Sequence, residues 1–281
     1  MKKKNSALIN LSQKIIRIFL LILIISGCSK SKKEFNSVEN DDWTKETKVS
    51  KLIKNVNFIF PENSHAFENK EEIINRTFDA IEDNIKILNK EEFTDTIYVR
   101  VMSSRDEMFI YTGTRAFGNT YPYWSTLYIV ANEDEVNPPI KHELMHLIAM
   151  LDWDYSKRNS TWMNEGIATY AANDCNGNNV EEIYRFLLEE DKLISIEDLT
   201  TDFYAQSDMV AYHQSAYIVQ YLLENYGLEK FKNLWTQGYE KFEEIYGLPY
   251  SKIKENLEDL VIEKYPKAPK IDWEIFSKGC K

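Results

Sequence analysis

Hydrophobic residues follow two different periods along this 281-residue chain. Three short segments of the first half are alternating or largely apolar, which predicts β-strands: Val56–Phe60, Thr96–Met102 and Trp124–Ala131. Between the first two, apolar residues recur at helical spacing, so a long helix is expected over Glu68–Asn89. Ser103 or Ser104 can cap a short helix after the second strand.

After a polar turn at residues 132–135, the pattern becomes almost entirely helical. Asn137, followed by Pro138 and Pro139, predicts a capped helix start, and this helix should run from Ile140 to about Leu151. Five further helices are expected: Trp162–Asn173, Val180–Asp191, Met209–Tyr226, Leu228–Gln237 and Tyr250–Tyr265. We therefore predict an α+β fold. Its small N-terminal part has a mixed sheet with helices, its C-terminal part is mostly helical, and an active-site cleft lies between them.

The first 27 residues have the composition of an export signal. They carry five basic residues and no acidic one, and an unbroken apolar run extends over Ile18–Ile25. This run is far shorter than the roughly twenty residues that span a bilayer, but it suits the core of a secretory signal peptide. The sequence from Ile25 to Cys28 resembles a bacterial lipobox, in which the cysteine is lipidated and becomes the new N-terminus. The alternative is an ordinary signal peptide followed by a chance cysteine.

Residues 28–50 are mostly Lys, Ser, Glu, Asp and Asn, a composition that favours a flexible tether rather than a packed core. The folded domain is expected to cover residues 51–281. These boundaries predict a protein held outside the cytoplasm, with a lipid on Cys28 anchoring it in the cell membrane or outer membrane.

The chain has 43% hydrophobic residues, enough for a buried core, and a formal net charge of −11. Without the five basic residues of the signal segment, 29 basic residues face 45 acidic ones. This excess of negative charge repels phosphate backbones, which argues against nucleic acid as a partner. Besides Cys28, the sequence contains Cys175 and Cys280. These two can pair and pin the C-terminal tail, or they can remain thiols, and the sequence leaves both possibilities open.

The segment from His142 to His146 fits the pattern H-E-x-x-H. Residues four apart on a helix share one face, with Cβ atoms about 5–6 Å apart, so both imidazoles can reach one metal ion. Glu143 is about 100° round the helix from His142, beside the metal face. There it can take a proton from a water on the metal without being a ligand itself. The alternative is a polar helix face with two incidental histidines.

Two histidines leave a catalytic zinc site one protein ligand short. Glu165 is the strongest candidate for the third ligand, because the 18 residues that separate it from His146 leave room for a loop and a returning helix. The alternative is a carboxylate placed near a helix start, where the helix dipole favours it.

H-E-x-x-H, followed by an Asn-Glu-Gly segment whose glutamate comes after eighteen intervening residues, resembles the gluzincin metallopeptidases, which include thermolysin and the aminopeptidase N type. The likeness is closer to the bacterial peptidase MA-like group, and it covers roughly residues 96–265. Three later stretches support it: Tyr212–Tyr217, Tyr221–Gly227 and Phe242–Leu248. The resemblance implies a zinc metallopeptidase that hydrolyses peptide bonds of a peptide or protein substrate. It also implies one zinc ion per chain, with His142, His146 and Glu165 as ligands and Glu143 as general base.

Stabilising the oxyanion in such a reaction requires a further hydrogen-bond donor. The resemblance favours Tyr212, and the neighbouring His213 is the alternative. In one respect the chain departs from thermolysin, which has an Asp four residues after its ligand Glu, where this chain has Thr169. The group that orients a zinc-binding histidine is therefore unassigned.

In gluzincins, an edge strand before the active-site helix pairs with the substrate backbone. Leu127–Ala131 is the candidate for that role, and the alternative is an ordinary strand within the sheet. Two rival functions also stay open. One is an inactive zinc-binding or scaffold lipoprotein, and the other is a zinc hydrolase of cell-wall amide bonds. The sequence does not indicate the natural substrate, the mode of cleavage or the oligomeric state.

Overall fold

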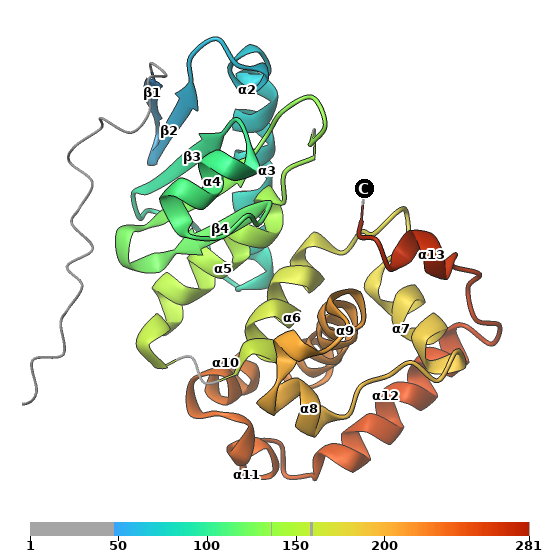
Figure 1. Cartoon of the computed structure of the whole chain (residues 1–281). Helices are drawn as coiled ribbons and strands as arrows, with labels where there is room; N and C mark the ends of the chain where they lie inside the picture. Colours follow the sequence, from blue (N-terminus) through green and yellow to red (C-terminus); the bar gives the residue numbers. More distant parts are fainter. Residues whose placement is uncertain (1–47, 136, 158–159, 281) are drawn as a thin grey trace, which may run out of the picture. The chain divides into compact units, whose positions relative to one another are not determined.

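The computed structural model describes residues 48–135, 137–157 and 160–280 (Figure 1). The expected signal peptide, the lipidation site Cys28 and most of the expected tether lie outside these residues. Residues 48–50, which we had assigned to the tether, belong to strand β1 (Lys48–Ile53). None of the described helices combines the length and the apolar character needed to cross a membrane.

A five-stranded mixed sheet forms the first part of the described chain, as predicted. Its strands are β1, β2 (Val56–Pro61), β3 (Ile97–Met102), β4 (Gly118–Tyr121) and β5 (Thr126–Val130). The spatial order is β1-β2-β3-β5-β4, with β2, β3 and β5 parallel and with β1 and β4 antiparallel to their neighbours. The sequence pattern predicted β2, β3 and β5 but missed both outer strands.

Alternating residues of the central strands face two hydrophobic clusters. Ile97, Val99 and Val101 of β3 join the main core, together with residues of α3 (Lys70–Ile87) and α5 (Ile140–Trp153). Met102, on the opposite face, packs with residues of β5 and α4 (Arg105–Thr112). In Figure 1, α4 accordingly lies over one face of the sheet, and α3 and α5 lie over the other. The sheet therefore supports α5, the helix that carries H-E-x-x-H.

The structure corrects two details of the prediction around α5. Leu127–Ala131 does not form an edge, because β5 lies between β3 and β4, and β4 is the edge strand on this side. Asn137 does not cap α5, because Pro139 occupies the N-cap position and no side chain caps the helix there. Two consecutive prolines place Asn137 too far from the first turn for its side chain to reach an N2 or N3 amide.

Helices make up the rest of the described chain, and those predicted from periodicity are present within a few residues. They are α6 (Thr161–Ala172), α7 (Val180–Glu189), α9 (Asp208–Tyr226), α10 (Leu228–Gln237) and α12 (Tyr250–Lys264). The short helices α2 (His65–Glu68), α8 (Ile196–Thr201), α11 (Phe242–Tyr246) and α13 (Trp273–Phe276) were not predicted. Helices this short contain too few residues to show a clear period.

Helices α6 and α9 pack against each other through Gly166. A Cβ atom at this position would lie 2.8 Å from the backbone oxygen of Ser215 and 2.7 Å from Cγ2 of Val219. Only a residue without a side chain allows two helix backbones to approach this closely. Because Glu165 directly precedes Gly166, this contact also fixes where Glu165 lies relative to α9.

Replacing Gly166 with Ala tests this contact, because two effects oppose each other. Helix propensity alone would make the Gly166→Ala protein more stable, by about 0.8–1.0 kcal/mol. The clash with Ser215 and Val219 acts in the opposite direction, and overpacking typically costs about 1–3 kcal/mol. We expect a net decrease in the free energy of unfolding, measured by chemical denaturation. An increase in stability would show that α6 and α9 are not in close contact at Gly166.

Candidate metal centre

Two imidazoles converge on one face of α5. His142 and His146 are one helical turn apart, their Nε2 atoms are 3.0 Å apart, and their rings meet edge to face with centroids at 4.6 Å. His146 is buried and His142 is partly exposed. The helix therefore brings the two nitrogens together as the H-E-x-x-H spacing predicts.

Glu165 reaches the same point from α6. Its Oε2 atom is 3.1 Å from Nε2 of His146 and 3.4 Å from Nε2 of His142. Two ligand atoms bound to one tetrahedral zinc ion at about 2.0–2.1 Å are separated by about 3.3 Å. The three observed separations are close to that value, and two imidazoles with one carboxylate are a known ligand set for catalytic zinc. His142, His146 and Glu165 therefore form a group that can hold a metal ion.

The electrostatics of this group favour a cation at its centre. Burial alone would raise the pKa of the Glu165 carboxyl, but the neighbouring His146 and His142 imidazoles reverse this and hold the pKa below its usual range. Burial would likewise lower the pKa of His146, but the Glu165 carboxylate outweighs it and raises that pKa. The carboxylate thus favours a positive charge on the neighbouring imidazoles, and a metal ion would supply such a charge at the same place.

Asn164 is the best candidate for the group that orients a histidine ligand, which the sequence left unassigned. Nδ1 of His146 and Oδ1 of Asn164 are both buried, and neither has a hydrogen-bond partner within normal geometry in the described part of the chain. An interaction between these two side chains nevertheless helps to raise the pKa of His146. The N–H group at Nδ1 of His146 is a donor and Oδ1 of Asn164 is an acceptor. A small movement of either side chain would therefore form a hydrogen bond between them.

Glu143 lies outside this group, and strand β4 holds it in place. Oε2 of Glu143 accepts a hydrogen bond of 2.7 Å from Oγ1 of Thr120, which is also 3.0 Å from the backbone oxygen of Glu143. Gly118 lies against the same carboxylate, since a Cβ atom there would be only 2.5 Å from Cγ and 2.6 Å from Oε1 of Glu143. The buried Glu143 carboxylate is thus held beside His142, His146 and Glu165 but is not one of the side chains that can hold the ion.

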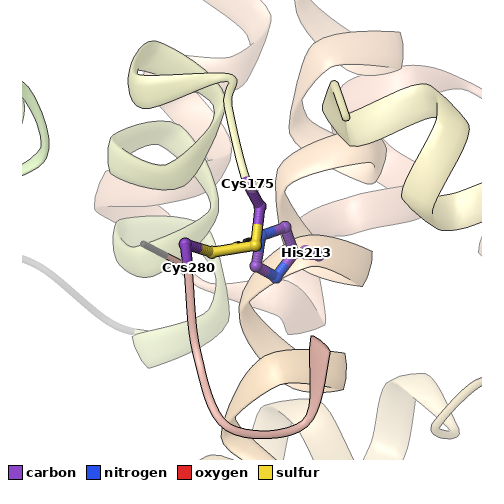
Figure 2. Close-up of side chains that lie close together, drawn as sticks. All are labelled: Cys175, His213 and Cys280. Carbon is purple, nitrogen blue, oxygen red and sulfur yellow. Dashed lines mark hydrogen bonds between the residues drawn. A yellow bond between two sulfur atoms is a disulfide. The ribbon is translucent and has the colours of Figure 1, made fainter. Parts of the chain in front are cut away.

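Tyr212 and His213 are adjacent on α9 but face different surroundings. The Tyr212 ring stacks on His142, with centroids 6.1 Å apart, so Tyr212 borders the metal-binding group. Burial, reinforced by the charge of Glu165, raises the pKa of Tyr212, which keeps its hydroxyl protonated at neutral pH. The ring of His213 instead lies beside Cys175 and Cys280 (Figure 2). The nitrogens of His213 face the backbone oxygen of Met209 and the sulfur of Cys280, so the structure does not bring this side chain into the metal-binding group.

Tyr204 is a further contact of the site that the sequence did not reveal. Its hydroxyl donates a 3.2 Å hydrogen bond to Oε1 of Glu165, the oxygen that does not face the histidines. It comes from a single 3₁₀ turn, Phe203–Ala205, which has no recognisable sequence pattern. This bond fixes the orientation of the Glu165 carboxylate.

A pocket of about 450 Å³ is lined by Arg185, Phe186 and residues 266–271, among others. It does not include the metal-binding group of His142, His146 and Glu165. It borders α7 and the segment before α13, and it contains none of the residues discussed above. The cleft expected between the sheet-containing part and the helical part therefore stays a prediction.

Comparison with known proteins identifies a family. The sequence profile of the Peptidase MA superfamily matches residues 89–251, more than half of the chain. A crystal structure of an aminopeptidase N family protein from Idiomarina loihiensis matches with a TM-score of 0.36 and 14% sequence identity. That match covers 83% of this chain but only 46% of the other, and its score is too low to bear on fold or reaction. Among curated proteins, none matches this chain.

The metal-binding group predicts a matched pair of variants. Glu165→Ala removes one of the three side chains that can hold a metal ion, so metal affinity should fall by more than the 10–100-fold that outer-shell changes typically cause. Glu107→Ala is the control, because Glu107 is equally buried but belongs to α4 and pairs with Lys48. Metal content per chain, measured by atomic emission, should be about one in the control and near zero in Glu165→Ala. Equal metal content in both variants would exclude Glu165 as a ligand.

Proposed function

Because the chain belongs to the Peptidase MA superfamily, we propose that it is a zinc-dependent metallopeptidase. The observation that carries this proposal is the separation of roles at the site. His142, His146 and Glu165 converge on one point, and Glu143 is held next to them by different partners. Three protein ligands leave the fourth position of a tetrahedral zinc ion open, which is typical of catalytic sites and not of structural ones.

The chemistry divides between the ion and the chain. Zinc held by His142, His146 and Glu165 would act as a Lewis acid toward the carbonyl of the scissile bond and the attacking water. The Glu143 carboxylate takes a proton from that water as general base and returns it to the leaving amine as general acid. Thr120 holds Oε2 of Glu143 in one position, which orients the carboxylate before the substrate arrives.

The position of β4 supports a peptide as substrate. This strand ends the sheet, and the residues that support Glu143, Gly118 and Thr120, both belong to it. An edge strand offers backbone donors and acceptors to an extended peptide, which can add to the sheet as a further strand. A peptide bound there would run beside Glu143. In the proposed enzyme, β4 therefore takes the role that the sequence analysis gave to Leu127–Ala131.

We assign the oxyanion donor to Tyr212 rather than to Tyr204. The raised pKa of Tyr212 keeps its hydroxyl able to donate a hydrogen bond throughout the neutral range. The hydroxyl of Tyr204, by contrast, already donates to Glu165 and serves to orient that ligand.

The alternative function, an inactive zinc-binding scaffold, does not explain why Thr120 and Gly118 hold a buried carboxylate at position 143. A site that only binds zinc needs no buried carboxylate beside its ligands, and a buried carboxylate is costly unless something compensates it. This chain compensates Glu143 with a hydroxyl donor from Thr120 and makes room for it with Gly118.

Glu143→Gln separates catalysis from zinc binding. The amide is close in size to the carboxylate, but it cannot accept the proton of the attacking water. General-base assistance is typically worth about 10²–10⁴-fold, so peptide hydrolysis should fall by at least that factor while zinc content stays near one per chain. Zinc content and cleavage of a mixed peptide library are measured side by side in the parent and the variant. Loss of zinc would make Glu143 a ligand or support, and unchanged activity would place the base elsewhere.

The role of Thr120 predicts a difference between two substitutions. Thr120→Val keeps the shape of the side chain but removes the hydroxyl that holds Glu143, whereas Thr120→Ser keeps the hydroxyl. A hydrogen bond to a charged group contributes about 1.5–3 kcal/mol, so kcat of Thr120→Val should fall by about tenfold or more. KM and zinc content should change little, and Thr120→Ser should retain most of the parent rate. If both variants lose the same activity, the hydroxyl is not what positions Glu143.

A further inference from the structure

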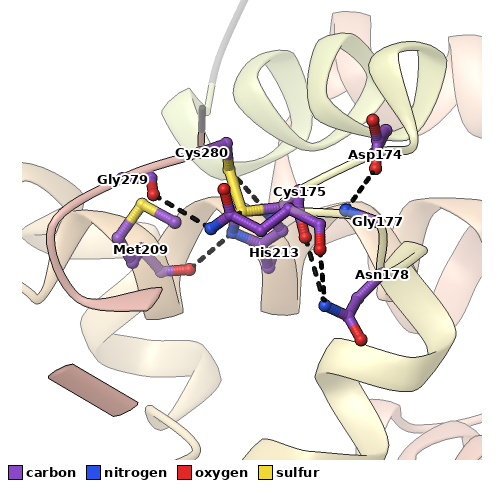
Figure 3. Close-up of a disulfide and its surroundings, with 9 residues drawn as sticks. Asp174, Cys175, Gly177, Asn178, Met209, His213, Gly279 and Cys280 are labelled. Carbon is purple, nitrogen blue, oxygen red and sulfur yellow. Dashed lines mark hydrogen bonds between the residues drawn. A yellow bond between two sulfur atoms is a disulfide. The ribbon is translucent and has the colours of Figure 1, made fainter. Parts of the chain in front are cut away.

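A second cluster of side chains that could hold a metal ion lies beside α9. Cys175 and Cys280 are joined by a disulfide, and the imidazole of His213 lies against it (Figure 3). The potential ligand atoms of these three residues all lie within 4.8 Å of one another. The cluster shares no residue with the candidate zinc site.

The hydrogen bonds of His213 determine which ring nitrogen carries its proton. Nδ1 is 2.7 Å from the backbone oxygen of Met209, and because a carbonyl only accepts, Nδ1 must be the donor. With the proton on Nδ1, the neutral ring carries its lone pair on Nε2. This is the arrangement by which proteins fix a metal-binding histidine, with one nitrogen held by a carbonyl and the other free to coordinate.

In the disulfide form, this lone pair has no proper partner. In the described part of the chain, Nε2 faces the Sγ atom of Cys280 at 3.6 Å and meets no hydrogen-bond donor, because a disulfide sulfur carries no hydrogen. A buried acceptor left without a donor is unfavourable. His213 is 5% exposed, so solvent does little to compensate. The surroundings of Nε2 are therefore suited to a state in which the disulfide is open.

We propose that Cys175, Cys280 and His213 bind one zinc ion when the disulfide is reduced. A dithiol reductant transfers two electrons and two protons to the S–S bond, becomes a disulfide itself and leaves two thiols. Each thiol releases its proton to solvent as its sulfur binds the ion, and His213 donates the Nε2 lone pair. Two thiolates and a neutral imidazole make an electrically neutral site with Zn²⁺, which lowers the cost of burying the ion.

The distances fit this assignment. Sulfur and nitrogen ligands bound to one tetrahedral zinc ion, at about 2.3 Å and 2.0–2.1 Å respectively, are separated by about 3.6 Å. The separation between Nε2 of His213 and Sγ of Cys280 already has this value. After reduction, the two sulfurs need to move to about 3.8 Å from each other. Cys280 is exposed and can make this movement, while Cys175 is held by a backbone bridge to Asn178.

Packing keeps Cys280 near the site even without the disulfide. Phe276 of α13 is buried in an apolar cluster with Cys175, Ile183 and Val210, and its ring contacts His213 with centroids 5.3 Å apart. Only residues 277–279 separate Phe276 from Cys280. After reduction, both thiols therefore remain close to the imidazole. Apolar side chains shield one side of this cluster from water.

Cobalt(II) provides a direct test, because cobalt bound to thiolate gives a charge-transfer absorption that a site without sulfur cannot give. The full chain is used with Cys28→Ser, so that Cys175 and Cys280 are its only cysteines. It is reduced with a phosphine, freed of reductant under argon and titrated with Co²⁺. We expect the thiolate band to saturate, to disappear on addition of Zn²⁺ and to be absent from the disulfide form, whatever further Co²⁺ is bound by His142, His146 and Glu165. Zn²⁺ should also slow alkylation of both thiols.

His213→Gln should raise the apparent Kd for Co²⁺ at least about tenfold, as expected when a site loses a ligand. His65→Gln is the control, because His65 belongs to α2, where its ring contacts Asn69, and it has no part in the cluster around Cys175 and Cys280. The absence of the band from the reduced parent chain, or of protection from alkylation, would overturn the proposal whatever the variants do. An unchanged band in a folded His213→Gln protein would show a thiolate pair that does not involve the histidine. Neither result depends on peptidase activity.

Discussion

The buried carboxylate of Glu165 is the constraint on which the rest of this structure depends. It lies inside the protein, opposite two imidazoles from another helix, and an isolated charge there would be strongly destabilising. The surrounding structure compensates it. The sheet supports α5 and hence His142 and His146, Gly166 brings α6 against α9, and Tyr204 holds the carboxylate oxygen that the histidines leave over. The contacts that place α5, α6 and the Phe203–Ala205 turn thus also serve the Glu165 carboxylate.

Much of this could be predicted from the sequence because the relevant signals are local. H-E-x-x-H places His142 and His146 together through helix geometry alone, and the long amphipathic segments identify the major helices. Strand β4 was missed because Gly118–Tyr121 contains a glycine and two polar residues and is only four residues long, so it has no apolar alternation to recognise. Its identity as the edge strand follows from pairing with β5, and sequence patterns carry little information about such pairing between segments.

The partners of the site residues were harder still to predict. Thr120 acts on Glu143 from 23 positions away, and Tyr204 acts on Glu165 from 39 positions away. Neither belongs to a motif, and either residue type is common at any surface. The disulfide between Cys175 and Cys280 joins residues 105 positions apart, which is why composition left that pairing open. His213 is next to Tyr212 in sequence, but in the structure it lies beside the disulfide, whereas Tyr212 lies beside His142.

The central claim is that a single zinc ion lies between α5 and α6. Anomalous X-ray diffraction at the zinc absorption edge locates such an ion directly in crystals of the zinc-loaded, disulfide-bonded protein. The account predicts one strong peak at about 2.0–2.2 Å from Nε2 of His142, Nε2 of His146 and Oε2 of Glu165, with Glu143 too far away to bind. A zinc-loaded crystal with no peak there, or with its only peak bound by other residues, would contradict it.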